Sequence, residues 1–190
     1  MCIRDRLTMA NRTTEDVFSL LDNLLKWTKS QIGNLNVVYQ DVDAVEVVDS
    51  VIDVFNMVAG LKKITIREEK PEKLPVCTDI DMLKTIIRNL LSNAIKFSNE
   101  NSEVLVKMEE QGDTVVVSVK DSGCGIDEEG QQKLLHTDTH FSTFGTNNEE
   151  GSGLGLLLCQ DFAVKSGGKL WFTSKKGEGS TFYFSIPLKK

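Results

Sequence analysis

The stretch from Asn89 to Phe97 constrains the fold of this chain most, because it combines a helical period with two chemically different faces. Residues three and four positions apart are neighbours on a helix, so Asn89, Asn93 and either Lys96 or Phe97 share one face. The positions between them predict a buried side: Leu90, Leu91, Ala94 and Ile95. Carboxamide oxygens can ligate Mg²⁺ and a lysine can meet phosphate, whereas a solvated polar face is the alternative interpretation.

The overall composition excludes several classes of protein. The 190 residues suit one domain with an appendage, and a net charge of −6 argues against a nucleic-acid partner. The cysteines lie far apart and form no CxxC pair, which argues against zinc and for a reducing compartment: Cys2, Cys77, Cys124 and Cys159. No apolar run is long enough to span a bilayer, so we expect no membrane contact from this segment and a cytoplasmic location.

The N-terminal part of the chain predicts one long helix. Residues 1–12 match nothing after them and lack the apolar centre of a signal peptide, so we expect a non-native or disordered leader there. Residues 13–33 begin with hydroxyl and acidic side chains and end near a glycine. Apolar residues recur between these ends at helical spacing: Val17, Leu20, Leu21, Leu24 and Leu25. Such a helix can lie on the domain or form half of a helical hairpin that pairs with another chain.

The remainder of the chain mixes helices with hairpins. Helical periods predict helices over residues 44–61, 79–97 and 127–135, and a further helix after residue 155. Alternating or short apolar runs predict strands over residues 37–39, 64–66, 75–77, 103–110, 114–120, 169–174 and 180–187, and residues 68–75 read as a charged turn. This order indicates an α+β fold, a two-layer sandwich whose mixed, mostly antiparallel sheet is covered by helices on one face.

An acidic residue followed by two glycines stands at the end of one predicted strand. In Asp121-Ser-Gly-Cys-Gly125, a buried carboxylate can accept a hydrogen bond from an amino group such as that of adenine. Glycines without Cβ atoms let a flat ring approach the backbone. The alternative is an ordinary Asp-Ser-Gly turn.

A glycine-rich segment opens the last predicted helix. Gly151-Ser-Gly-Leu-Gly155 follows the long polar loop of residues 136–150, and backbone N–H groups at such a helix start can bind phosphates. The spacing fits neither a Rossmann fingerprint nor a Walker loop. A flexible linker is the alternative, but the apolar run that follows at once argues against it.

Taken together and in this order, the motifs resemble the ATP-binding domain of sensor histidine kinases. These motifs are Asn-x-x-x-Asn-x-x-Lys-Phe, Asp-x-Gly-x-Gly, Gly-x-Gly-x-Gly, and Gly-x-Gly-Ser-Thr-Phe at residues 177–182. DNA gyrase B, the heat-shock chaperones of this superfamily and the mismatch-repair ATPases share that fold. The resemblance covers residues 41–190, and residues 20–31 resemble the second helix of the family's dimerisation and phosphotransfer hairpin.

The resemblance implies roles for individual residues. Asn93 matches the ligand of Mg²⁺, and Asn89 and Lys96 match the catalytic asparagine and the basic group near the phosphates. The adenine pocket is implied at Asp121, Gly123, Gly125, Ile126 and Thr181. The phosphate-binding segment is implied at Gly151, Gly153, Leu154 and Gly155, and Ser142 to Gly145 match part of the lid over the nucleotide.

Asn89 also separates the kinases of this superfamily from its ATPases. The related ATPases resemble one another in having a glutamate here that activates water, and an asparagine cannot be a general base. The resemblance therefore implies a protein-histidine kinase that transfers the γ-phosphoryl group of ATP to a histidine for relay to an aspartate of a response regulator receiver domain. We expect slow ATP hydrolysis. We also expect the full-length parent protein to be a homodimer, and that protein can be membrane-anchored.

This sequence departs from the family pattern in two places. The family's acceptor histidine lies on the first helix of the hairpin, whereas this chain begins at the second, and its histidines, His136 and His140, fall in the lid region. Leu135 stands where a lid phenylalanine is common, although Phe141 and Phe144 can replace it. The competing interpretations are a catalytically incomplete nucleotide-binding signalling module, a serine kinase of the anti-sigma type and a gyrase-like ATPase, the last disfavoured by Asn89.

Overall fold

The computed structural model describes residues 36–134, 145–146 and 153–189, with Leu21, Leu24, Leu25 and Thr28 near the N-terminus. The chain divides into two units, residues 1–36 and residues 37–190. In the first unit Leu21, Leu24, Leu25 and Thr28 are helical and exposed, and the Thr28 hydroxyl donates to the Leu24 carbonyl at 2.7 Å. They agree with the helix predicted over residues 13–33, while the leader expected at residues 1–12 lies outside the described residues.

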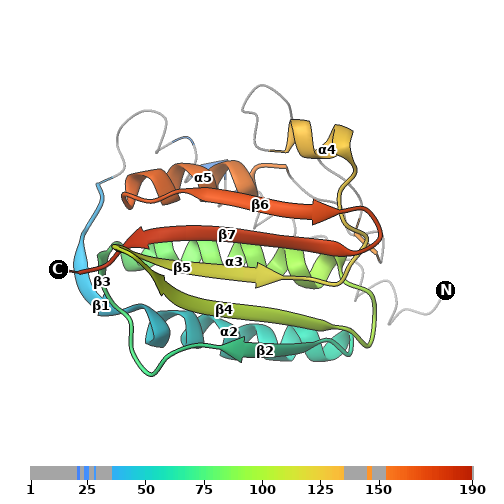
Figure 1. The fold of residues 1–190 in the computed structure, drawn as a ribbon, viewed down its shortest axis with the longest axis horizontal. Coiled ribbons are helices and arrows are strands. Elements are labelled where there is room, and N and C mark those ends of the chain that lie inside the picture. The colour runs from blue at the N-terminus through green and yellow to red at the C-terminus, as the bar shows by residue number, and fades with distance from the viewer. Residues whose placement is uncertain are drawn as a thin grey trace. The chain divides into compact units, whose positions relative to one another are not determined.

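The second unit is built on a five-stranded sheet in the order β2-β4-β5-β7-β6 (Figure 1). Its strands are β2 (Thr65–Glu69), β4 (Glu103–Gln111), β5 (Thr114–Lys120), β6 (Leu170–Lys175) and β7 (Gly179–Pro187). Only the β2–β4 pair is parallel, and the other pairs in this sheet are antiparallel. The prediction of a mixed, mostly antiparallel sheet is therefore confirmed.

Helices cover one face of this sheet. Figure 1 shows α2 (Ala44–Leu61), α3 (Ile80–Phe97) and α5 (Gly155–Lys165) behind the strands, with the short α4 (Glu128–Lys133) near one end of β6. A separate antiparallel pair is formed by β1 (Gln40–Asp43) and β3 (Pro75–Thr78). This arrangement confirms the predicted two-layer α+β sandwich. Within the described part of the chain, no helix is both long and apolar enough to cross a membrane.

Helix α3 lies at the centre of the core. Asp79 caps its N-terminus by accepting from the backbone N–H groups of Asp81 and Met82, and the apolar face predicted for it is buried. Alternate residues of β5 and β7 face the helices because side chains alternate along a strand. They are fully or almost fully buried: Val115, Val117, Val119, Phe182, Phe184 and Ile186.

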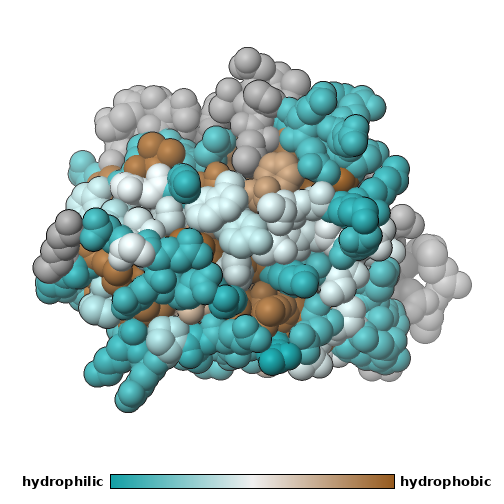
Figure 2. All heavy atoms as spheres, viewed as in Figure 1, coloured by the Kyte–Doolittle hydropathy of each residue, from teal (hydrophilic) through white to brown (hydrophobic). Residues whose placement is uncertain are grey.

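The opposite face of the sheet carries no helix in Figure 1, and Figure 2 shows that face with hydrophilic and weakly hydrophobic side chains across most of it. Trp171 and Tyr183 stack there with ring centroids 5.3 Å apart, and the Lys169 ammonium lies 4.9 Å from the Trp171 ring centroid. Side chains alternate between the two faces along each strand, and the more polar set lies on this face.

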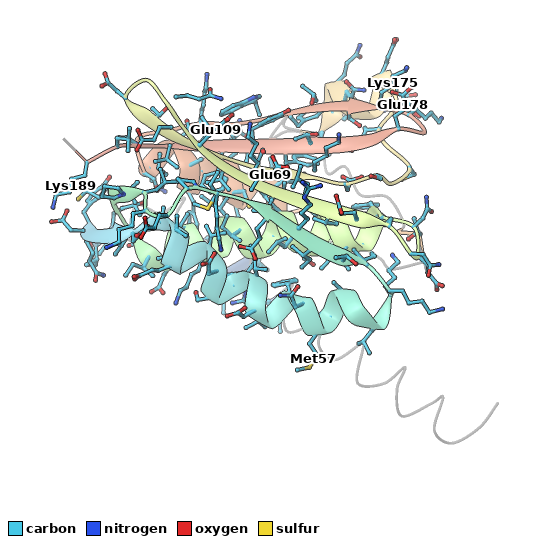
Figure 3. The ribbon with its side chains drawn as sticks, turned by 60° about the horizontal axis from the view of Figure 1, so that its bottom comes forward. Met57, Glu69, Glu109, Lys175, Glu178 and Lys189 are labelled. Carbon is cyan, nitrogen blue, oxygen red and sulfur yellow. The ribbon has the colours of Figure 1, made fainter. Side chains whose placement is uncertain are left out.

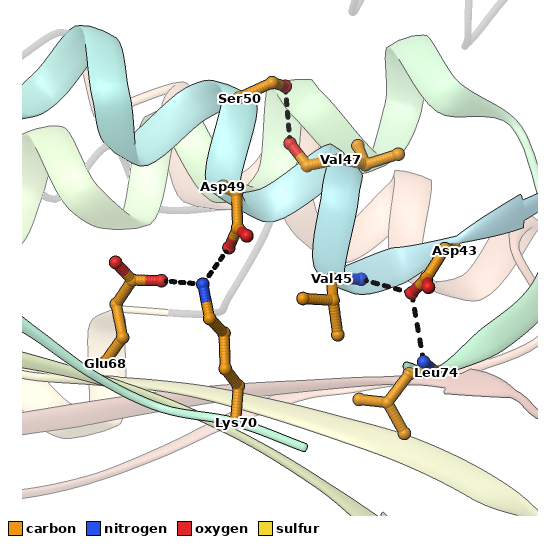
Figure 4. Close-up of polar contacts among 8 residues, drawn as sticks. All are labelled: Asp43, Val45, Val47, Asp49, Ser50, Glu68, Lys70 and Leu74. Carbon is orange, nitrogen blue, oxygen red and sulfur yellow. Dashed lines mark hydrogen bonds and ion pairs between the residues drawn. The ribbon is translucent and has the colours of Figure 1, made fainter. Parts of the chain in front are cut away.

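Helix α2 is attached to the chain that follows it by two polar clusters (Figure 4). Asp43 Oδ1 accepts from the N–H groups of Val45 and Leu74, which caps the helix and holds the turn before β3. The Lys70 ammonium lies 2.5 Å from carboxylate oxygens of both Asp49 and Glu68. On its outer side α2 exposes Met57, which is 79% accessible and points away from the sheet in Figure 3.

Two element predictions need correction. The short strand expected at residues 37–39 is wrong, because the strand begins at Gln40, where its backbone pairs with β3. The strand expected at residues 64–66 begins at Thr65 and continues through Glu69, into the stretch read as a charged turn. Its position at the sheet edge explains the charges, because edge strands tolerate charged side chains that a central strand would bury.

Candidate functional site

The polar face of α3 meets the start of α5. The Asn89 carboxamide donates from Nδ2 to the Thr85 carbonyl at 2.9 Å. A Cβ atom on Gly155, the first residue of α5, would lie 2.6 Å from Asn89 Oδ1. The absence of a side chain at Gly155 therefore lets the start of α5 approach the asparagine, and two motifs far apart in the sequence come together.

Asn93 and Lys96 follow Asn89 along the same helix face. Asn93 is half-buried, and its carboxamide forms no hydrogen bond within the described residues. The Lys96 ammonium lies 5.1 Å from the centroid of the Phe97 ring. The oxygen of Asn93 can therefore be offered to a ligand or cation beside a positively charged group.

Asp121 supplies a buried carboxylate with one oxygen already occupied. Its side chain is 4% exposed overall, and Oδ1 accepts from the N–H groups of Gly123 at 2.9 Å and Ser180 at 3.2 Å. No hydrogen bond from another residue in the described part of the chain reaches Oδ2. Burial raises the pKa of Asp121 above its ordinary value of 3.8, and these backbone hydrogen bonds only partly oppose the effect. The carboxylate therefore presents Oδ2 as an acceptor in a poorly solvated place.

The loop from Asp121 to Gly125 lies between the end of α3 and the β6–β7 hairpin. A Cβ atom on Gly123 would lie 2.1 Å from the Phe97 carbonyl oxygen, and one on Gly125 would lie 2.0 Å from that of Lys175. Gly125 also has a φ of +62°, which favours glycine. The tip of the hairpin carries the Lys175–Glu178 ion pair labelled in Figure 3. Both predicted glycines are thus required by close backbone contacts.

Hydrogen bonds from the hairpin complete this attachment. Gly177 donates its N–H to the Cys124 carbonyl at 2.7 Å. The Ile126 N–H donates to the Ser174 hydroxyl at 2.8 Å, which attaches the residue after the loop to β6. The two hydroxyls of Ser174 and Ser180 are 2.9 Å apart. The loop is therefore held in one conformation by backbone and hydroxyl groups of the last two strands.

The glycine-rich segment is described in part. Gly153 has a φ of +69°, and Leu154, which is 8% exposed, stands at the N-cap of α5, where its side chain forms no capping hydrogen bond. The backbone N–H groups at the start of a helix point along its axis and can donate to an anionic ligand. Gly151 lies outside the described residues, as do His136 and His140 of the lid region.

Thr181 is not brought to this site. It pairs with Lys120 and Thr173 in the sheet, and strand alternation turns its side chain to the face opposite that of Phe182 and Ser180. Ser180 contacts Asp121 instead, through its N–H group and the carbonyl that accepts from the Asp121 N–H at 2.9 Å. The register of the two strands explains this contact, because Thr181 pairs with Lys120 and Ser180 therefore lies opposite Asp121.

A magnesium ion fits these residues only with help from a ligand. Among the described residues, no group of three or more histidine, cysteine, aspartate or glutamate side chains could hold a metal. Mg²⁺ commonly keeps several waters and is held by few protein oxygens together with substrate phosphates. The Asn93 carboxamide, which is half-buried one turn after Asn89 on α3, suits that kind of site.

Comparisons with known proteins agree with this geometry. The adaptive-response sensory kinase SasA of Rippkaea orientalis is 30% identical over 171 residues, which are 89% of this chain and 43% of SasA. The solved catalytic domain of the histidine kinase ThkA is 30% identical with a TM-score of 0.69, and the match covers 80% of this chain and 96% of that domain. The chain thus spans less than half of the curated relative.

A second solved structure resembles the chain in fold. It is the histidine kinase ThkA in complex with the response regulator protein TrrA, at 24% identity and a TM-score of 0.77, covering 98% of this chain and 52% of that one. Residues 78–190 match the family described as histidine kinase-, DNA gyrase B- and HSP90-like ATPase. This match takes in α3, the Asp121 loop and the start of α5. Because it extends over more than half of the sequence, the chain belongs to the histidine kinase-, DNA gyrase B- and HSP90-like ATPase family.

Proposed function

We propose that this chain binds ATP with Mg²⁺ and acts as the catalytic domain of a two-component sensor histidine kinase. In this proposal the γ-phosphoryl group passes to a histidine and then to an aspartate of a response regulator receiver domain. The observation that carries the proposal is the Asp121 carboxylate, which is buried, held through Oδ1 by backbone groups and open to a donor at Oδ2. Membership of the family supports the same assignment.

Asp121 selects adenine through its unoccupied oxygen. The exocyclic amine of adenine is a donor, and Oδ2 is the acceptor that it would meet. Gly123 and Gly125 shape the pocket by letting the loop pack closely against the Phe97 and Lys175 carbonyls, and Ile126 supplies an apolar neighbour at the end of the loop. A donor–acceptor pair in a poorly solvated pocket favours adenine over other bases, because a base without the amine would leave the buried carboxylate without a hydrogen-bond donor.

The phosphates would lie between α3 and the start of α5. Lys96 and the N–H groups of Gly153 to Gly155 supply positive charge and donors, and Asn93 supplies an oxygen ligand for Mg²⁺. When bound, the ion neutralises charge on the phosphates. Asn89 touches Gly155 and holds the two helices in register, but it cannot take a proton from water. We therefore expect slow ATP hydrolysis, with the γ-phosphoryl group transferred to a protein acceptor and not to water.

The proposal extends to the organisation of the parent protein. Residues 13–33 would form the second helix of the dimerisation and phosphotransfer hairpin, and residues 41–190 the ATP-binding domain. Neither His136 nor His140 is proposed as the acceptor, which belongs to the first helix of the hairpin. A homodimer then arises from hairpin pairing, and the solved complex of ThkA with TrrA supports a receiver domain as the second partner.

A calorimetric titration with Mg-ATP tests the proposal. Asp121→Asn should abolish binding, because the two backbone N–H groups hold the side-chain oxygen and turn the new amide toward the amine of adenine, donor against donor. Asp113→Asn, at the exposed β4–β5 turn, is the matched control and should bind like the wild type. Absence of binding by the wild type, or equal binding by the Asp121 variant, would overturn the adenine site.

Phosphotransfer requires a separate measurement. With a dimerisation hairpin that carries an acceptor histidine, the wild-type chain should form acid-labile phosphohistidine and pass the phosphoryl group to a receiver domain. Binding of ATP without any transfer would reduce the assignment to a nucleotide-binding signalling module. Phosphate release at the rate of a dedicated ATPase, without an acceptor, would contradict the role assigned to Asn89.

A further inference from the structure

Lys62 follows α2 directly and is a buried lysine whose ammonium donates hydrogen bonds to three oxygen atoms. The residue is 7% exposed, although lysine is rarely buried unless its ammonium is paired. Its Nζ atom donates to the carbonyl oxygens of Ile95 at 3.0 Å and Lys96 at 2.8 Å, and to the Thr146 hydroxyl at 2.6 Å. The two carbonyls belong to the last turn of α3, where helix carbonyls have no partner within the helix.

The charge of Lys62 is well placed for that helix end. The C-terminus of a helix carries partial negative charge, and a cation there is stabilising, the more so where water is excluded. Lys62 therefore links the end of α2 to the end of α3, although α2 contributes none of the nucleotide-binding residues assigned above.

Thr146 also contacts the C-terminal end of α3. It belongs to the connection between α4 and α5, and its N–H donates to the Lys96 carbonyl at 3.2 Å. Its hydroxyl lies 2.8 Å from the Ser98 carbonyl oxygen while it accepts from Lys62. Gly145 beside it is buried. Thr146 is thus attached to the end of α3 by hydrogen bonds of its backbone and its side chain.

This cluster lies between the two halves of the proposed nucleotide site. Lys96, on the phosphate side, has its carbonyl held by Lys62 and Thr146. The next carbonyl, that of Phe97, touches Gly123 in the loop of Asp121 on the adenine side. A shift of this backbone would therefore move both a phosphate-side group and the adenine loop.

We propose that Lys62 is a positioning residue for nucleotide binding, which acts by fixing Thr146 and the backbone of Lys96 and Phe97 in one arrangement. The inference rests on the proposed function, since it names a residue that prepares the same site. The Lys62 ammonium donates to protein oxygens of α3 and Thr146. Its effect passes through the Lys62–Thr146 contact and the end of α3.

Matched variants separate this role from a general effect on folding. Lys62→Met removes the ammonium and keeps the length of the side chain, and Lys63→Met changes the adjacent exposed lysine as a control. Thr146→Val removes the hydroxyl at constant shape, and Thr146→Ser restores it. Two quantities are measured for each: the hydrogen-exchange protection of the Thr146 amide without nucleotide, and the dissociation constant of Mg-ADP by calorimetry.

Lys62→Met and Thr146→Val should lose protection of the Thr146 amide. Each should also raise the dissociation constant of Mg-ADP roughly tenfold, which corresponds to the loss of one charge-assisted hydrogen bond. Lys63→Met and Thr146→Ser should keep both properties. If Lys62→Met fails to fold, the comparison of Thr146→Val with Thr146→Ser decides alone.

The outcomes also separate this inference from the proposed function. Unchanged Mg-ADP affinity in both Thr146→Val and Lys62→Met would overturn the inference while leaving the ATP site intact. If the wild-type chain binds no nucleotide, both the proposed function and the positioning role are refuted. If the variants nevertheless lose protection of the Thr146 amide, the Lys62–Thr146 attachment stands as a structural contact only.

Discussion

At Asp121 the two carboxylate oxygens have different surroundings, and this difference governs how the residue responds to pH. Oδ1 accepts two backbone N–H groups, whereas Oδ2 is open to a ligand. Burial raises the pKa of Asp121 in the folded chain above the ordinary value of 3.8, which applies when the chain is unfolded. The carboxyl group therefore supports folding fully below pH 3.8, and this contribution is lost as the pH rises through the raised pKa.

Nucleotide affinity should have the opposite pH dependence. The amine of adenine needs an ionised acceptor, so the affinity for Mg-ADP should fall as the pH is lowered through the raised pKa of Asp121, while the nucleotide-free fold gains stability from this group. Calorimetric titrations at a series of pH values measure the first effect and urea unfolding the second. An affinity that stays constant down to the ordinary aspartate value would contradict the raised pKa of Asp121, and one that stays constant below that value would show that Asp121 does not accept from the base.

At the scale of elements, the β6–β7 hairpin acts as the support of the Asp121 loop. Gly177 bonds to Cys124, and the Lys175 carbonyl lies against Gly125 with no room for a Cβ atom. Gly112, in the β4–β5 turn, has nearly the same φ, +63° against +62° for Gly125, but no atom lies within 4 Å of its Cβ position. The two glycines therefore differ in steric contact and not in backbone strain.

This pair of glycines gives a direct measurement of the hairpin contact. Gly112→Ala should cost about 1–2 kcal/mol of unfolding free energy, the expense of a left-handed conformation for alanine. Gly125→Ala should cost at least about 2 kcal/mol more, because the loop must move away from Lys175, and it should weaken Mg-ADP binding. Urea unfolding and calorimetry give both quantities. Equal losses of stability in the two variants would contradict the close contact.

At the scale of the whole 37–190 unit, α3 joins every part of the candidate site. It packs between α2 and α5 under the sheet (Figure 1), carries Asn89, Asn93 and Lys96, and supports the Asp121 loop at Phe97. A nucleotide that touches α3, this loop and the start of α5 would bridge segments that are far apart in the chain. Its binding should therefore oppose global unfolding and not only local motion.

The thermal midpoint should rise when nucleotide and metal are both present. At one hundred times its dissociation constant a ligand adds about 2.7 kcal/mol to the stability of the folded state. For a chain of this size that corresponds to an increase of about 5–10 °C in the midpoint. Chelation of Mg²⁺ should remove most of the increase in calorimetric scans with ATP. The same increase in EDTA would argue against a metal held by Asn93 and the phosphates.

Much of the fold could be predicted because its determinants are local. The Asp79 cap and the apolar period from Met82 to Ile95 define α3 within one stretch of sequence, and the glycines at 123, 125, 153 and 155 mark the loops around it. Helical neighbours lie three and four residues apart, so a helix and its polar face can be inferred without knowledge of the rest of the chain.

Only the tertiary structure decided which groups meet. Ser180 and not Thr181 reaches Asp121, because the antiparallel register of β5 and β7 pairs Thr181 with Lys120 and leaves Ser180 opposite Asp121, and a strand alone does not indicate its register. The strand at Gln40 depends on pairing with β3, and the burial of Lys62 depends on the joint approach of α3 and Thr146. The sequence by itself determined the helices, the loops and the chemical class of the site through local spacing. The partners of Ser180, Gln40 and Lys62 were decided by contacts between distant segments, which form only when the layers pack.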